Sequence, residues 1–164
     1  MKLDLDGIDK GIAVDRLGEL LRTRGVRDAW IDAGGSSIAS LGPAGGSPPR
    51  RIAIADDRSE EAAIVELRDG ALSTSGNWMR MAMSGATDIG HIFDPRTGEP
   101  ALNDIVSATV VAPSCADSDA IAKACLILPR VEAAEVLAAG GWSAVLLLGK
   151  GSGADRTIEV ARLP

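Results

Sequence analysis

The spacing of hydrophobic and polar positions divides the chain into a few helices and many short strands. Apolar residues from Ile8 onwards recur at nearly helical spacing, and Gly25 follows two arginines as a stop signal. An amphipathic helix is therefore predicted from about residue 9 to 24. The Ala-rich segments Asp117–Leu128 and Val131–Ala139 predict further helices.

Short β-rich runs bounded by glycine, proline or polar turns predict about seven strands. Asp69-Gly70 is a typical hairpin signal between two of these runs. Several adjacent hairpins with two or three helices favour the α+β class, with a largely antiparallel sheet. Nine runs are candidates for these strands, namely Lys2–Asp6, Ala29–Ala33, Ser37–Leu41, Arg51–Ala55, Ala62–Leu67, Ala71–Ser75, Ile105–Ala112, Trp142–Leu148 and Thr157–Leu163.

Composition narrows the picture to one domain, residues 1–164, with an aliphatic core. Aromatic residues make up only 2% of the chain, so Ala, Val, Ile and Leu must fill the interior. The net charge of −6 argues against a nucleic-acid partner, which needs a basic face. No apolar stretch reaches membrane-spanning length and no signal peptide is evident, so we expect a cytoplasmic chain without a membrane span.

Two clusters of polar residues and glycines stand out where the chain is predicted to change direction. Asp6 to Gly11 lies at a strand-to-helix junction and could bring backbone groups to an anion or a metal, although a capped helix start explains it as well. Ser73 to Asn77 offers three hydroxyls and a glycine at a strand end, which suit a phosphate, but an exposed turn would have the same residues.

Two further clusters carry the candidate catalytic groups. His91, the only histidine, precedes a dense Asp94-Pro95-Arg96-Thr97-Gly98 turn, and histidine exchanges protons near neutrality. Asp117 and Asp119 begin an Ala-rich helix, where acids serve either as caps or as a carboxylate aimed at a metal. Lys123 follows Asp119 by one helical turn, on the same face, and can pair with it.

Together, and in this order, these segments resemble the ApbE family of flavin transferases. HIFDPRTGEP (residues 91–100) agrees with the family pattern His-x-x-Asp-Pro-x-Thr-Gly-x-Pro at every defined position. DLDGIDKGIAVDRL (4–17), IDAGGSSIASLG (31–42), ALSTSGNWMR (71–80) and SATVVAPSCADSDAIAKACLIL (107–128) resemble other family segments. The order and spacing of the segments are more specific than any one of them. The resemblance covers nearly the whole chain and implies the later half of the family fold, without its N-terminal segment.

The resemblance implies a transfer of FMN from FAD to a Ser or Thr hydroxyl of an acceptor flavoprotein, with release of AMP. It implies Mg²⁺ as cofactor, with Asp119 and the carbonyl of Asp9 as metal ligands, and His91 and Asp119 as catalytic residues. The residues that would line the FAD site are Lys10, Ile12, Ser73, Thr74, Ser75, Gly76, Asn77, His91, Ile92, Asp94 and Thr97.

Two other functions stay open. The chain could be a non-catalytic flavin-binding or interaction module that kept the fold, because Lys123 stands where the resemblance places a threonine of the metal site. It could also be one half of a split enzyme, completed by a partner chain or by a homo-oligomer.

Overall fold

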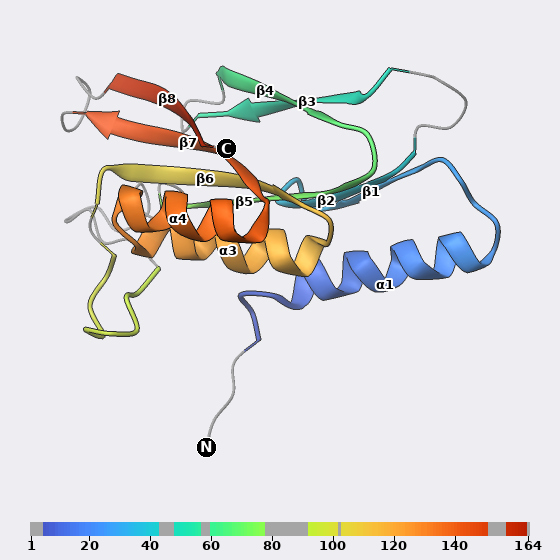
Figure 1. The fold of residues 1–164 in the computed structure, drawn as a ribbon, viewed down its shortest axis with the longest axis horizontal. Helices are drawn as coiled ribbons and strands as arrows, with labels where there is room; N and C mark the ends of the chain where they lie inside the picture. The colour runs from blue at the N-terminus through green and yellow to red at the C-terminus, as the bar shows by residue number, and fades with distance from the viewer. Residues whose placement is uncertain are drawn as a thin grey trace.

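Three helices and eight strands make up the described part of the chain in a computed structural model (Figure 1). The structure describes residues 5–42, 48–56, 60–77, 92–101, 103–150 and 157–163. The helices are α1 (Asp9–Thr23), α3 (Cys115–Ile127) and α4 (Arg130–Gly140). The strands are β1 (Ala29–Ala33), β2 (Ser37–Leu41), β3 (Arg50–Ala55), β4 (Glu61–Leu67), β5 (Gly70–Gly76), β6 (Ile105–Ala112), β7 (Ser143–Lys150) and β8 (Thr157–Leu163).

The strands form one large and one small antiparallel sheet. Six of them follow the order β1-β2-β5-β6-β7-β8, and every neighbouring pair in this sheet is antiparallel. Among the described residues, strands β3 and β4 pair only with each other. The predicted α+β class, with a largely antiparallel sheet and two or three helices, is confirmed.

The large sheet lies between the helices and the β3–β4 hairpin, so both of its faces are covered (Figure 1). On β7, Leu146 and Leu148 pack toward α3 and α4, whereas Val145 and Leu147 pack toward β3 and β4. Successive side chains of a strand point to opposite faces, and here each face meets an apolar layer. This is why β7 is a continuous aliphatic run instead of an alternating one.

The predicted Asp69-Gly70 hairpin is wrong. Strand β5 does not pair with β4; it lies between β2 and β6 in the large sheet, while β4 pairs with β3. Gly70 begins β5 with a φ of 135°, a backbone conformation that side chains other than glycine rarely adopt. The turn is therefore a corner between two sheets.

The first element and one helix start also differ from the expectation. Most of the expected strand Lys2–Asp6 lies outside the described residues, and Leu5 and Asp6, which are described, are not in a strand. Helix α3 begins at Cys115 instead of Asp117, because the side chain of Ser114 accepts the N–H of Asp117 as the N-cap.

Helix α1 approaches α3 very closely, and Gly11 makes this approach possible. A Cβ added at Gly11 would lie 2.7 Å from the carbonyl oxygen of Cys115 and 2.8 Å from the Cα of Ala116. The contact places the N-terminal turn of α1 beside α3, near the C-terminal end of the central strand β5.

Candidate functional site

A cavity of about 760 Å³ lies where the first turn of α1, the end of β5 and one face of α3 meet. Segments far apart in the sequence thus come together, including parts of all four clusters singled out above. The described residues that line it are Asp6, Gly7, Lys10, Gly34, Ser36, Thr74, Ser75, Gly76, Ile92, Phe93, Asp119, Lys123 and Ile127.

The α3 wall of this cavity carries an ion pair between Asp119 and Lys123. The Nζ atom of Lys123 lies 2.7 Å from Oδ1 of Asp119 and 3.1 Å from its carbonyl oxygen. Asp119 is only 4% exposed, and its second carboxylate oxygen, Oδ2, is buried with no hydrogen-bond donor among the described residues. The pairing predicted from the i, i+4 spacing is confirmed.

The α1 wall carries a second lysine. The Nζ atom of Lys10 donates to Oγ of Ser36 at 2.5 Å, which links α1 to the turn between β1 and β2. That turn contains Gly34 and Gly35, both with positive φ, and Gly34 and Ser36 line the cavity. Ser36 could not be predicted as a site residue from the sequence, because only the fold shows that its hydroxyl meets Lys10.

The end of β5 supplies the polar groups that form the floor of the cavity. Thr74, Ser75 and Gly76 line it, and the backbone N–H of Thr74 donates to the carbonyl of Ser36 at 2.8 Å. The Oγ1 atom of Thr74 lies 2.8 Å from Oγ1 of Thr109. Hydroxyls held in this way can turn toward an oxygen-rich ligand.

Two other predicted cofactor residues, Ser73 in β5 and Asn77 directly after it, are buried. Ser73 is fully buried, and its hydroxyl lies 2.8 Å from Oγ of Ser118 in α3. Asn77 is 7% exposed, and its side-chain oxygen has no hydrogen-bond partner among the described residues. Neither residue lines the cavity in the described part of the chain, so their predicted contact with the cofactor stays a prediction.

The Asp94–Gly98 turn is a hydrogen-bonded loop beside the cavity. The Asp94 carboxylate accepts the backbone N–H of Arg96 at 2.8 Å and its guanidinium at 2.7–3.1 Å. The side-chain hydrogen bond from Arg96 lowers the pKa of the Asp94 carboxyl below its usual range. The backbone carbonyl oxygen of Asp94 accepts the N–H groups of Thr97 and Gly98. Asp94 therefore shapes the loop.

This loop divides its residues between two neighbouring hollows. Asp94 and Thr97 line a separate cavity of about 420 Å³, whereas Ile92 and Phe93 line the larger one, and Ile127 borders both. Phe93, the only phenylalanine in the chain, is 53% exposed. His91 lies outside the described residues, so its catalytic role stays a prediction.

The described residues do not fit a magnesium ion. Magnesium requires near-octahedral oxygen ligands, but Lys123 occupies Oδ1 of Asp119, and Oδ2 is buried. Asp9, whose carbonyl is the predicted backbone ligand, does not line the cavity in the described part of the chain, and neither does Ile12. No group of three His, Cys, Asp or Glu residues suited to a metal occurs among the described residues.

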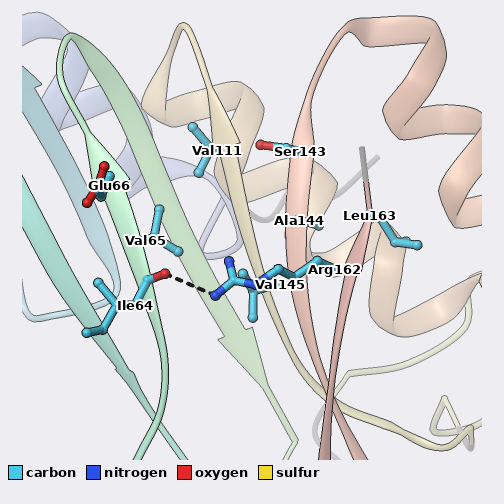
Figure 2. A pocket seen from close by; sticks show the side chains of 9 residues that line it. All are labelled: Ile64, Val65, Glu66, Val111, Ser143, Ala144, Val145, Arg162 and Leu163. Atoms are coloured by element: carbon cyan, nitrogen blue, oxygen red, sulfur yellow. Dashed lines mark hydrogen bonds between the residues drawn. The ribbon is translucent and has the colours of Figure 1, made fainter. Parts of the chain in front are cut away.

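A third cavity, of about 360 Å³, lies on the opposite face of the large sheet (Figure 2). Arg162 reaches from β8 across Val145 and donates to the carbonyl oxygen of Ile64 on β4 at 3.2 Å. Its other lining residues are mainly aliphatic. The arginine joins the small sheet to the large one, and we assign this cavity to the packing of the two sheets.

The fold and the larger cavity define an α+β protein with a lysine-bearing polar site at the end of a central strand. The chain belongs to the ApbE family, whose profile matches residues 1–146. A Flavin Transferase ApbE from Vibrio cholerae has a similar structure, with a TM-score of 0.78 and 27% identity, over 98% of this chain and 50% of that one. The ApbE protein from Thermotoga maritima gives a TM-score of 0.79 at 27% identity, over 96% and 50%.

Similar proteins are known as FAD:protein FMN transferases. The Rhodobacter capsulatus protein of this name is 38% identical over 148 residues, covering 89% of this chain and 28% of that protein. The Klebsiella pneumoniae protein is 29% identical over 154 residues, covering 92% of this chain and 44% of that protein. The chain thus spans half or less of the length of these relatives. In the part of the chain that the structure describes, no helix has the length and apolar character needed to cross a membrane.

Proposed function

We propose that this chain forms the diphosphate-binding half of an FAD:protein FMN transferase. The observation that supports it is the meeting of three distant segments, Asp6–Lys10, Thr74–Gly76 and Asp119–Lys123, around one cavity. Two ammonium groups, several hydroxyls and a glycine backbone suit the oxygens of a diphosphate. The names of the family relatives agree with this substrate class.

The reaction is a displacement at the phosphorus of the FMN moiety. The hydroxyl oxygen of an acceptor Ser or Thr forms a bond to that phosphorus, and the bond to the bridging diphosphate oxygen breaks, so AMP leaves with that oxygen. Negative charge spreads over the phosphoryl and leaving oxygens, and fixed cations in a confined site stabilise it. Lys10 and Lys123 line the cavity and are the cations that this chain itself would supply.

We propose His91 as the base that takes the acceptor hydroxyl proton. Only the family pattern supports this role, in which His91 opens the HIFDPRTGEP segment. The hydrogen-bonded Asp94 turn would hold Ile92 and Phe93, the two residues that follow His91, at the rim of the cavity. Magnesium is not included in this mechanism, because the described ligands do not fit it.

We further propose that residues 1–164 form one domain and correspond to the later half of the family fold. A dinucleotide site must enclose most of its ligand to exclude water. We expect the other half of the family fold to complete that enclosure.

A second candidate function is flavin binding without turnover. The Lys123–Asp119 pair favours it, because an ammonium cannot bridge the attacking and leaving oxygens with fixed geometry as a metal ion does. Such a module would hold FAD or FMN and present it to another protein.

The test is incubation of the purified chain with FAD and a flavoprotein acceptor that ApbE relatives modify. Transfer adds one FMN mass to the acceptor and releases an equal amount of AMP, whereas the binding module gives neither and still quenches flavin fluorescence. The variant His91→Ala should lose transfer and keep FAD binding. Activity of this variant close to that of the unmodified chain would remove His91 from the mechanism, and absence of FAD binding by the unmodified chain would refute both functions.

A further inference from the structure

The ammonium of Lys123 is held in one place at the wall of the cavity. Two of its three N–H donors are directed to Asp119, one to Oδ1 at 2.7 Å and one to the carbonyl oxygen at 3.1 Å. No other described residue accepts the third donor. A positioned donor that borders a cavity and has no acceptor among the described residues is available to a ligand oxygen.

The stem of this lysine is packed as well. A Cβ added at Gly7 would lie 3.3 Å from Cε and 3.5 Å from Cδ of Lys123, so the turn before α1 lies against the side chain. The Lys123 side chain is 28% exposed. A long lysine normally samples many rotamers, and this packing restricts them.

The charges around the cavity depend on this lysine. The charged residues that line it, in the described part of the chain, are Asp6, Asp119, Lys10 and Lys123. These formal charges cancel. Without Lys123 the residues that line the cavity would carry a net negative charge, which repels a diphosphate. The buried carboxylate of Asp119 would also lose its partner, and an unpaired buried charge is costly.

We propose that the Lys123 ammonium is the resident cation of this site and that the chain binds a dinucleotide diphosphate without a divalent metal. The proposal rests on the proposed function for the identity of the ligand. A metal ion would need the same Asp119 oxygen that Lys123 holds, and two neighbouring cations repel each other. Metal and lysine therefore exclude one another at Asp119.

The test is calorimetric titration of the full chain with ADP and with FAD, once in excess EDTA and once in millimolar magnesium chloride. We expect dissociation constants that agree within about twofold between the two buffers. The variant Lys123→Met should weaken binding in EDTA by roughly ten- to a hundredfold, the range expected for loss of a charged hydrogen-bond donor. The variant Lys150→Met is the matched control, because it removes the lysine of another ion pair, with Glu159, that lies outside the cavity.

Direct metal binding gives a second readout that does not depend on the nucleotide. Electron paramagnetic resonance of Mn²⁺ should show no ion bound by the unmodified chain, and binding by Lys123→Thr, which frees the Asp119 oxygen. If Lys123→Met does not fold, the comparison of EDTA and magnesium for the unmodified chain still decides the question.

The outcomes separate this proposal from the proposed function. Binding that tightens tenfold or more with magnesium in the unmodified chain would overturn the role of Lys123 and leave a flavin transferase intact. Equal affinities of Lys123→Met and the unmodified chain in EDTA would overturn it too. Absence of ADP and FAD binding in both buffers would overturn both proposals together.

Discussion

Asp15 in α1 caps the N-terminus of α3 through the backbone of Cys115. Its Oδ1 accepts the N–H of Cys115 at 2.7 Å, and its Oδ2 accepts the N–H of Ala116 at 2.9 Å. The first N–H groups of a helix have no partner within the helix, and the positive end of its dipole favours a carboxylate. One side chain thus fixes two walls of the candidate site relative to each other.

Replacement of Asp15 by alanine should destabilise the domain by about 1–3 kcal/mol, because two partly buried N–H groups lose a charged acceptor. Thermal or urea unfolding measures the difference. Glu19→Ala is the control on the same helix, since Glu19 forms only an exposed ion pair with Arg16 and should change stability by less than about 1 kcal/mol. Equal losses from the two variants would show that the cap contributes nothing specific.

Gly11 and Gly18 of α1 should respond to alanine with opposite signs. A Cβ at position 11 would lie 2.7 Å from the backbone oxygen of Cys115, so Gly11→Ala must push the helices apart and should cost about 1–3 kcal/mol. At position 18 the nearest atom to an added Cβ is 3.6 Å away, which is an ordinary contact. Gly18→Ala should therefore gain up to about 1 kcal/mol of helix propensity. Urea unfolding of the two variants checks the signs, and a Gly11→Ala variant as stable as the unmodified chain would contradict the close contact at Gly11.

The pattern of hydrophobic and polar residues predicted where the strands and helices lie better than it predicted which strands pair. The apolar run at Trp142–Leu148 is a strand of the sheet, β7 (Ser143–Lys150), as predicted, because aliphatic runs of that length have few other places to be buried. Asp69-Gly70 reverses the chain, but a dipeptide does not determine which strand lies beside the next one. Pairing of β5 with β2 and β6 depends on residues far away in the sequence.

The candidate site could be predicted only where one element contains both partners. The i, i+4 spacing on α3 was enough to pair Lys123 with Asp119. It could not show that Asp119 is buried while Asp117, two residues earlier, is exposed, because that depends on what packs against each face of the helix. Lys10 and Ser36 belong to different elements, and their contact follows from the approach of α1 to the sheet.

Alkaline pH should weaken the fold through Cys125. Burial raises the pKa of its thiol to about 11, and burial also raises the pKa of Cys115. An unfolded thiol titrates near about 8.5, so the native state retains a proton that the unfolded state releases. The stabilisation is complete below that value and is lost as the pH rises toward 11, by at most about 1.4 kcal/mol per pH unit for each thiol.

Urea unfolding between pH 8 and 10.5, roughly the window set by these pKa values, measures this slope. The chain has no tyrosine, so no phenol titrates in the same range. Cys125→Ala should lower stability at every pH and have a shallower alkaline slope than the unmodified chain. Identical slopes would show that the Cys125 thiol does not carry the effect.

Phe93 should contribute to the affinity for FAD by stacking on one of its rings. The side chain lines the larger cavity and is 53% exposed, an unusual position for a large aromatic residue in a chain with so few of them. The bridge between Phe93 and Pro100, together with the Asp94 turn, holds its backbone in place. Stacking of a base on an aromatic ring contributes about 1–3 kcal/mol, so Phe93→Ala should weaken FAD binding roughly five- to a hundredfold.

Flavin fluorescence titration measures the change, and parallel titrations with FMN and ADP identify which ring stacks. Val131→Ala, at an exposed apolar residue of α4 outside this cavity, should bind FAD as the unmodified chain does, and the same result for Phe93→Ala would exclude stacking.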